Sequence, residues 1–430
     1  MFPLLLLVLF IVLSFKDYRK IPFYLIISII LFSPVNVLEK YSIIRLLFSF
    51  VIVYGITYRK KCFASTKIDK YVFVASAYPI AASVFVALFA SSLTFGEQLS
   101  HIRGTVYELA AFWIIWKLRL STTDFYKCNK YIMILVPIIC LYGIFEYFTK
   151  SHPYLTFINN FSAVDLVSRA DFSIQDARGA LSGRITGVAP YTIQYGALML
   201  ILLLYVISTC AKDYSKFVLL GTSLLLLSNL YLTGSRGPIV SLAVPAFLYY
   251  AKTLSIQKKI LGIILLIFAY YFLDRIDAFS LASDDLHGSS TDGRLEQLDA
   301  SIYFMMSRDG FLFGNGAGYS SSLIDIYSKA DLGGGEFEGV LLYGLVDYGV
   351  LGLFLVFFVK LFVYLYLGYK AYAEKMINKT NLLFLTMILS AFTINALIVG
   401  EAYSNLFFIV YLMVLKYLTL QTRVVYDETR

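Results

Sequence analysis

The residues best suited to chemistry lie in a long polar interval, residues 273 to 339, between two apolar runs. It holds twelve Asp or Glu residues against four Lys or Arg residues. One of these is Arg294, and arginine binds phosphate groups through two parallel hydrogen bonds. Glu338 stands at the start of the next apolar run, where it serves either as a helix cap or as a general base. The interval therefore combines groups suited to anion binding and to proton transfer.

A second candidate for anion binding is Arg236, in the short connection 233 to 237 between two apolar runs. A tight turn between helices needs residues such as Gly234 and Gly237, but nothing about the turn requires an arginine. Pro238 is typical of the first turn of a helix, whose free amide groups would lie beside Arg236. The arrangement predicts a phosphate site, with a simple anchor to lipid head groups as the alternative.

Charged residues in or beside apolar runs form a third set, because ionisable groups at such depth are costly and usually face a polar cavity. Arg45 lies near the start of one run, and Arg103 and Glu108 flank the start of another. Each has a simpler explanation: Arg45 can extend to the head groups, and Arg103 can pair with Glu108 at the surface. Arg184 lies just before a further apolar run, and its sequence position fits a solvated loop residue and an anion ligand equally well.

The glycine-rich stretch Gly314 to Gly318 is a poor dinucleotide fingerprint, because no strand precedes it and its spacing is wrong. A tight turn explains its glycines better. The three histidines, His101, His152 and His287, are scattered, and no His or Cys cluster has the spacing of a metal site. We therefore expect neither a cofactor nor a metal ion.

The composition indicates which elements position these residues. The chain has 430 residues, 59% of them apolar, and a mean hydropathy of +0.75, whereas soluble domains are about 45–50% apolar. We therefore expect an all-α, polytopic integral membrane protein. The net charge of +8 does not indicate a nucleic-acid partner, because the basic residues sit in short clusters between apolar runs.

Runs of about 17 to 25 apolar residues predict about 12–13 transmembrane helices. Two long polar segments between them predict two larger outer loops. The expected organisation is a set of N-terminal helices (1–148), a first large loop (149–189), central helices (190–273), a second large loop (274–338) and C-terminal helices with a tail (339–430). The spans are placed near residues 2–15, 21–36, 41–57, 71–94, 104–120, 131–148, 190–210, 217–233, 237–251, 260–273, 339–359, 382–400 and 406–420.

Basic residues determine the predicted orientation. They cluster in six alternate connections, which all fall on one side when the helices are threaded in order, and that side is predicted to be the cytoplasm. The C-terminal tail ends there as well, and the two large loops lie on the outer face. The charges of the first apolar run follow it instead of preceding it, which favours a retained helix with its N-terminus outside.

Within the second large loop, apolar residues recur at helical spacing from Leu295 to Met305. They predict an amphipathic helix of about three turns, with Asp292 as its N-cap. The helix is expected either on the membrane surface or packed against the bundle. Arg294 would then lie in its first turn, near the membrane boundary.

Three stretches resemble the O-antigen polymerase and O-antigen ligase superfamily of bacterial membrane glycosyltransferases. They are Arg184 to Gly187, Leu232 to Pro238, and the large loop from Gly293-Arg294 through Phe313 to Gly318 and on to the helix with Asp347 and Gly349. The similarity covers roughly residues 180 to 360 and implies a GT-C-like fold. Ligases of the superfamily typically carry a histidine at the position that Glu338 occupies here. This departure favours a polymerase.

The resemblance implies an enzyme that joins oligosaccharide repeat units carried on undecaprenyl pyrophosphate, with inversion at the anomeric carbon. It acts at the periplasmic face of the bacterial inner membrane, among membrane lipid, beside a chain-length regulator and a flippase. Glu338 would accept the proton of the acceptor hydroxyl. Arginines would stabilise the leaving pyrophosphate, chiefly Arg236 and Arg294. The other arginines expected to bind it are Arg184, Arg45 and Arg103.

Three alternatives remain open from the sequence. An O-antigen ligase differs only in its acceptor, which is lipid A-core. A flippase or transporter of lipid-linked oligosaccharides would be expected to have short loops on both sides and charges deep within several spans. A structural or binding protein would have no need for Arg236 and Arg294 to converge on a boundary cavity.

Overall fold

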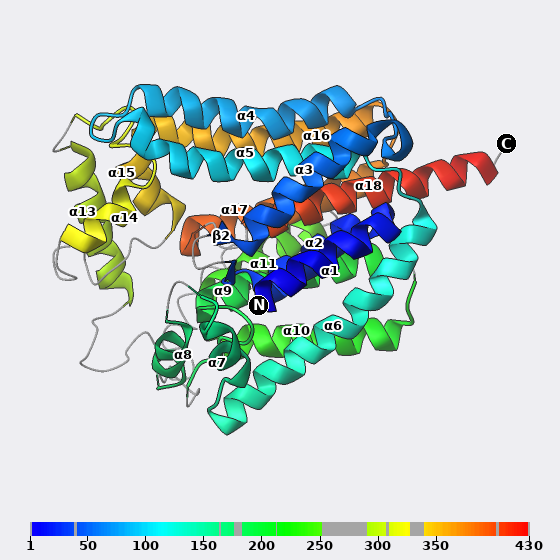
Figure 1. Ribbon diagram of the computed structural model, residues 1–430, viewed down its shortest axis with the longest axis horizontal. Helices are drawn as coiled ribbons and strands as arrows, with labels where there is room; N and C mark the ends of the chain where they lie inside the picture. Colours follow the sequence, from blue (N-terminus) through cyan, green and yellow to red (C-terminus); the bar gives the residue numbers. More distant parts are fainter. Residues whose placement is uncertain are drawn as a thin grey trace.

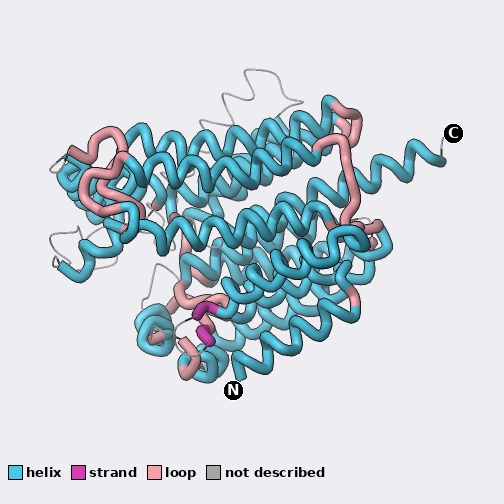
Figure 2. The backbone as a smooth tube through the Cα atoms, turned by 45° about the horizontal axis from the view of Figure 1, so that its top comes forward, coloured by secondary structure: helices cyan, strands magenta, loops and turns pink. Residues whose placement is uncertain are grey.

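The computed structural model describes residues 2–37, 41–162, 165–175, 183–211, 213–251, 290–306, 309–326, 339–400 and 404–428. These residues are mostly helical (Figures 1 and 2). The α-helices are α1 (Phe2–Lys16), α2 (Ile21–Phe32), α3 (Ile43–Cys62), α4 (Asp69–Leu88), α5 (Phe95–Lys117), α6 (Thr122–Thr149), α7 (Pro153–Asn159), α8 (Leu166–Gln175), α9 (Thr192–Tyr205), α10 (Lys216–Leu232), α11 (Arg236–Ala251), α13 (Ser290–Met306), α14 (Tyr319–Ile326), α15 (Val340–Leu353), α16 (Lys360–Ala373), α17 (Lys379–Val399) and α18 (Ser404–Glu428). Shorter elements are the 3₁₀-helix η1 (Tyr18–Lys20), the π-helical segments η2 (Val206–Cys210) and η3 (Phe354–Val359), and the paired strands β1 (Asn36–Val37) and β2 (Tyr41–Ser42).

Six of the described helical segments are long and apolar enough to cross a membrane, as expected for a membrane protein. The predicted span near 260–273 lies outside the described residues. Each of the other predicted spans falls on a helix, so the helical framework agrees with the apolar runs. The six segments are Asp69–Leu88, Thr122–Thr149, Thr192–Cys210, Val340–Ala373, Lys379–Ile398 and Ser404–Thr422.

Two capping boxes explain where α5 and α6 begin. Thr94 accepts a hydrogen bond from the backbone of Glu97, whose side chain in turn accepts one from the backbone of Thr94. Ser121 and Asp124 form the same reciprocal pair at the start of α6. Because each box satisfies two N–H groups that the helix leaves free, helix α5 begins at Phe95 and not at residue 104. The predicted outer connection 95–103 is therefore helical.

The helices form a bundle with α9 and α18 near its centre, where both are largely buried. Helices α4, α5 and α16 run side by side along one edge (Figure 1), and α4 contacts both of the others. Helix α11 packs against α17, and α10 lies against α6 and α9. The mostly apolar faces of these helices interlock into one large core cluster.

One end of the bundle carries the large connections and is called the loop-bearing end below. Helices α4, α6, α10 and α17 end there, and α3, α5, α9, α11 and α18 begin there. The short helices α7, α8, α13 and α14 gather at the same end, at the left of Figure 1. The predicted loop 149–189 contains α7 and α8, and the predicted loop 274–338 contains α13 and α14.

The opposite end of the bundle is stabilised by two lysines. Lys416 of α18 is buried within the bundle, and its Nζ donates hydrogen bonds to the carbonyl groups of Ile115, Trp116 and Leu118 where α5 ends. Lys117 beside them forms an ion pair with Asp69 at the start of α4. The last carbonyl groups of a helix have no partner within it, so Lys416 satisfies them.

The predicted eleventh span, residues 339 to 359, is interrupted. Gly349 has φ +64° and ψ −175°, outside the helical region. The freed carbonyl groups of Val346 and Asp347 accept hydrogen bonds from the N–H groups of Asn315 (3.0 Å) and Gly316 (2.9 Å). An unbroken helix of 34 residues would be roughly 51 Å long, longer than the apolar core of about 30 Å. The part before the break instead packs against α13 and α14.

Helix α13 differs in detail from the prediction. It begins at Ser290, so Asp292 lies inside its first turn and is not its N-cap. Ile302, expected on the packed face, is 42% exposed. The buried face of α13 includes two polar residues as well as apolar ones, and the helix packs against α15. The buried side chains of α13 are Gln297, Ser301, Phe304 and Met305.

Candidate functional site

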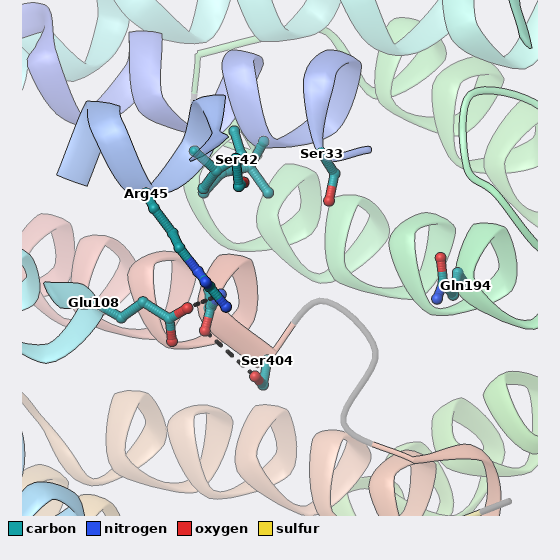
Figure 3. A pocket seen from close by; sticks show the side chains of 9 residues that line it. Ser33, Ser42, Arg45, Glu108, Gln194 and Ser404 are labelled. Carbon is teal, nitrogen blue, oxygen red and sulfur yellow. Dashed lines mark hydrogen bonds between the residues drawn. The ribbon is translucent and has the colours of Figure 1, made fainter. Parts of the chain in front are cut away.

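A pocket of about 290 Å³ lies at the loop-bearing end, among α2, α3, α5, α9 and α18. Helices α3, α9 and α18 each contribute residues of their first turn to its lining. A helix N-terminus has free N–H groups and a partial positive charge that favour an anion, and three such ends outnumber the one C-terminal end, that of α2, at the pocket. The lining residues are Ile29, Ser33, Ser42, Ile44, Arg45, Glu108, Gln194, Ser404 and Asn405 (Figure 3).

Two of the three helix ends lack a side-chain cap. Ser42 precedes α3 and Tyr191 precedes α9, and neither side chain forms a capping hydrogen bond with its helix. Ser42 and Gln194, two neutral polar residues, both line the pocket. The pocket therefore offers several neutral donors around its charged groups.

Arg45 supplies the positive charge of the pocket. It lies in the first turn of α3, and its side chain extends toward Glu108 and Ser404 (Figure 3). The guanidinium passes close to α5, since a Cβ atom at Gly104 would lie 3.6 Å from Nη2. In the described ranges of the chain, no side chain forms a hydrogen bond or ion pair with this guanidinium. Arg45 is therefore placed to bind an anionic group that enters the pocket.

Glu108 supplies the carboxyl group of the pocket. Its Oε1 accepts a hydrogen bond of 2.6 Å from Nδ2 of Asn405. The hydroxyl of Ser404 donates to Oδ1 of the same Asn405 at 3.4 Å. Glu108 lies nine residues before Lys117, the last residue of α5, which corresponds to roughly 13 Å along the helix axis. The half-buried carboxyl group is thus held in place by the start of α18.

Arg103 does not share this pocket. Five residues along an α-helix correspond to a rotation of roughly 140°, so Arg103 and Glu108 lie on different faces of α5. Arg103 is exposed and is not among the lining residues. This placement does not favour its predicted role as a ligand of the pyrophosphate.

His101 belongs to the first part of α5, before the predicted fifth span. A Cβ atom at Gly318 would lie 2.1 Å from its Nε2, so the imidazole packs directly on the glycine-rich turn. Burial lowers the pKa of His101, and the positive charge of Arg45 lowers it further. Both effects favour the neutral form of the imidazole.

Arg184 is buried, with only 6% of its surface exposed. Its Nε donates to the carbonyl of Thr233 (2.8 Å), and its Nη2 donates to the hydroxyl groups of Thr192 (2.6 Å) and Ser235 (3.4 Å). These bonds hold the 233–237 turn against the start of α9. Arg184 therefore positions the turn that carries Arg236 and does not itself line the pocket.

Glu146, near the end of α6, is a fully buried carboxyl group that the sequence reasoning missed. Its Oε1 accepts hydrogen bonds from the N–H (3.1 Å) and the hydroxyl (2.9 Å) of Thr186, and its Oε2 accepts one from the N–H of Gly187 (2.7 Å). The segment 184–187 is thus held from both sides. An acidic residue within an apolar run was the available signal, because such a residue is rarely there without a partner.

Arg236 is the first residue of α11, and its side chain is not described. The turn before it requires glycine at 234, where φ is +62° and a Cβ atom would lie 3.1 Å from Nε of Arg184. A Cβ atom at Gly196 would lie 3.1 Å from the ring of Pro238, so the turn adjoins α9. Helix α9 also lines the pocket, so it lies between the pocket and the backbone of Arg236.

The glycine-rich stretch forms the tight turn that the sequence suggested. Gly314, Gly316 and Gly318 have φ values of +71°, +115° and +89°. A Cβ atom at Gly314 would lie only 2.3 Å from the carbonyl oxygen of Asp347. Nδ2 of Asn315 donates to the carbonyl groups of Phe304 and Val346, both at 3.1 Å. The turn is thus docked on the break in α15.

Two further polar side chains secure this docking and were not singled out from the sequence as site residues. The carboxyl oxygens of Asp347 accept hydrogen bonds from the N–H groups of Gly318 (3.0 Å) and Ser320 (2.6 Å), at the start of α14. Oε1 of Gln98 accepts a hydrogen bond from the N–H of Ala317 at 3.0 Å. The turn therefore joins α14, α15 and the start of α5, and its glycines have a structural role.

The last two predicted site residues are only partly located. Arg294 lies in α13, and its side chain is not described, while Glu338 lies outside the described residues. The next residue, Gly339, precedes α15 with φ +87°. A Cβ atom there would lie 2.6 Å from the carbonyl oxygen of Leu397, so the start of α15 lies against the end of α17.

Among the described residues, no group of three or more His, Cys, Asp or Glu side chains gathers as metal ligands would. Comparison with protein-family models gives no match, and comparison with curated proteins gives none. The fold and the pocket together define a helical membrane protein with a polar, anion-suited cavity at one end of its bundle.

Proposed function

We propose that the protein is a polymerase of surface polysaccharide, acting on oligosaccharide repeat units linked to undecaprenyl pyrophosphate. The observation that supports this proposal is the pocket in which Arg45 and three helix N-termini meet. A pyrophosphate leaving group needs compensation of its negative charge, and guanidinium groups and helix N-termini provide it. The resemblance of residues 180 to 360 to O-antigen polymerases supplies the choice of reaction.

In the proposed reaction, the hydroxyl oxygen of one lipid-linked repeat unit attacks the anomeric carbon of another. The new glycosidic C–O bond forms as the bond from the anomeric carbon to the pyrophosphate oxygen breaks. The electron pair leaves with undecaprenyl pyrophosphate, and the proton of the attacking hydroxyl passes to a base. Arg45 and the helix N-termini stabilise the leaving group. This stabilisation lowers the energy of the transition state, because negative charge develops on the pyrophosphate there.

Two carboxylates are candidates for the base. Glu338 is proposed from its position at the start of α15 and from the resemblance. Glu108 is a second candidate because it lines the same pocket as Arg45, where Asn405 orients it. A glutamine substitution at each position distinguishes the two candidates. Replacing the residue that acts as the base lowers the reaction rate, whereas replacing the other glutamate does not.

The remaining arginines have different proposed roles. Arg236 is proposed as a second ligand of the pyrophosphate, because the turn before it adjoins α9 next to the pocket. Arg294 is also proposed to bind the pyrophosphate, and only the family resemblance supports this role. Arg184 is proposed to position Arg236, since its guanidinium is engaged by the turn before α11. The active site is proposed to face the periplasm, with the C-terminus in the cytoplasm of the bacterium.

The deciding experiment combines a deletion of the gene with a gel of the surface polysaccharide. A polymerase predicts lipid A-core that carries single repeat units, with the longer ladder lost and restored by the wild-type gene. Lipid A-core without any repeat unit, together with accumulated lipid-linked polymer, would instead identify a ligase. An unchanged ladder would contradict both enzymes for this polysaccharide.

Purified protein then tests the chemistry directly. With undecaprenyl-pyrophosphate-linked repeat units as the only substrate, a polymerase releases undecaprenyl pyrophosphate and forms longer lipid-linked chains. A transporter of these lipids would move them across a vesicle membrane without release of pyrophosphate. The absence of both chain extension and release would contradict the proposal.

A further inference from the structure

The turn from Gly310 to Gly314 presents apolar side chains outward, although it belongs to a segment predicted to be an aqueous loop. Phe311 is 48% exposed and Leu312 is 51% exposed. Turns in water usually carry small polar residues, whereas this one places three large apolar residues, Phe311 to Phe313, between two glycines. A contiguous exposed apolar surface of this kind marks an interaction site.

The turn is continuous with the end of α4. The ring of Phe313 stacks on that of Phe89, with centroids 5.1 Å apart, and meets the ring of Phe85 edge to face at 5.8 Å. Leu88 and Phe89 are 64% and 55% exposed. Because α4 is long and apolar enough to cross a membrane, its outward apolar side chains face lipid. The turn extends that lipid-facing surface.

The backbone of the turn is hydrogen-bonded to α15 just after the break at Gly349. The N–H of Val350 donates to the carbonyl of Phe311 (2.9 Å), and the N–H of Leu351 donates to that of Leu312 (3.0 Å). Val350 and Leu351 are themselves 45% and 40% exposed. The turn therefore lies between two apolar surfaces, and its backbone is held rigidly where the helix resumes.

We propose that the turn 310–314 inserts into the lipid leaflet at the loop-bearing end, at the boundary between head groups and acyl chains. Its occupant is bulk membrane lipid, because the turn continues the lipid-facing end of α4 without interruption. The turn thereby anchors α13, α14 and the glycine-rich turn to the membrane surface. This inference does not depend on the proposed enzyme activity.

Single labelled cysteines test the proposal. The four native cysteines are buried, so a fluorophore attaches selectively to an introduced one, and the unsubstituted protein measures the background. Leu312→Cys is the test position, and Phe311→Cys is a second one in the same turn. Ile134→Cys, exposed in the middle of α6, is the membrane reference, and Ser321→Cys, exposed on α14, is the aqueous reference. Each labelled protein is placed singly in nanodiscs of phosphatidylethanolamine and phosphatidylglycerol without polyprenyl lipid.

Quenching by lipids with a doxyl group near the head group or deep in the acyl chain then reports depth. We expect the label at 312 to be quenched at least about twofold more by the shallow than by the deep doxyl lipid. The label at 134 should respond to the deep lipid, and the label at 321 to neither. Weak quenching at 312 by both lipids, with strong quenching by iodide in the water, would overturn the proposal. Quenching that requires added polyprenyl phosphate, or a second copy of the protein in the disc, would overturn it as well.

Discussion

At the scale of single residues, the charged side chains fall into two groups with different surroundings. Arg184 and Glu146 are buried and are hydrogen-bonded to backbone and hydroxyl groups, so they organise the chain around them. Arg45 faces a pocket instead, with a helix N-terminus on either side. An arginine already engaged within the fold has less capacity to bind a ligand, and this separates Arg45 from Arg184.

Replacement of Arg45 tests the pocket. Arg45→Ala should lower the rate of chain extension by about 10²-fold, the typical effect of removing one preorganised donor. Arg45→Lys should restore part of it, because the charge remains while the bidentate geometry is lost. Arg59→Ala, an exposed arginine near the other end of the same helix α3, is the matched control. The assay is release of undecaprenyl pyrophosphate by purified protein, and an Arg45→Ala rate equal to that of the control would contradict the role.

Replacement of Glu146 tests the buried positioning network. Glu146→Ala removes the acceptor of Thr186 and Gly187 and leaves buried donors without a partner, which costs about 1–3 kcal/mol for each such group. We expect a lower temperature of thermal unfolding in detergent, with a smaller loss for Glu146→Gln because its side chain keeps one acceptor oxygen. Glu374→Ala, at an exposed position after α16, should unfold like the wild type. Equal unfolding temperatures for the two alanine variants would contradict the assignment.

At the scale of elements, the break in α15 and the turn that docks on it form one unit. The N–H groups of the turn satisfy carbonyl groups that the break leaves free, so each element stabilises the other. Non-helical backbone near a membrane is tolerated only where it is satisfied by protein or water. The close approach explains why glycine occupies both Gly314 and Gly349, since a Cβ atom at either would clash with the other's backbone segment.

A pair of glycine variants tests this unit. Gly314→Ala forces a Cβ atom to within 2.3 Å of the carbonyl oxygen of Asp347 at a φ of +71°. The backbone conformation alone costs about 1–2 kcal/mol, and the clash adds to it, so a clear loss of stability in denaturant unfolding is expected. Gly221→Ala in α10, where a Cβ atom would meet no atom within 4 Å, should instead stabilise by about 0.5–1 kcal/mol. A neutral Gly314→Ala would disprove the tight docking.

At the scale of the whole molecule, the bundle separates two kinds of end. The loop-bearing end carries the pocket and the short helices, and the other end carries Lys416 and the ion pair of Lys117 with Asp69. The polar groups of the loop-bearing end belong to segments far apart in the chain, from Arg45 to Asn405. The distribution of basic connections predicts that the end without the pocket faces the cytoplasm.

Fusion proteins test this orientation. A fluorescent protein after Arg430 should fluoresce, because the C-terminus is predicted in the cytoplasm. Alkaline phosphatase fused after Ser151, before α7, should be active, since it needs the oxidising outer compartment. The same phosphatase fused after Arg119, between α5 and α6, should be inactive. The reverse pattern of activity would show that the molecule has the opposite orientation.

Much of the helical framework could be predicted from the sequence, because an apolar run of membrane length has few options other than a helix. The boundaries were less predictable. The start of α5 depends on the Thr94 capping box, and α15 breaks at Gly349 although its apolar run continues. The packed face of α13 was predicted in part: Leu298 and Met305 lie on it and Ile302 does not, while Gln297 and Ser301 are buried through contacts that only the tertiary structure creates.

The sequence by itself determined that this is a helical membrane protein and that arginines and carboxylates gather near the ends of its apolar runs, because hydropathy and charge act locally along the chain. Only the tertiary structure decided which of them meet. It placed Arg45 and Glu108 in one pocket, turned Arg103 away from it and engaged Arg184 within the fold. The physical reason is that the direction of a side chain depends on the rotation and packing of its helix, and these are set by partners far away in the sequence.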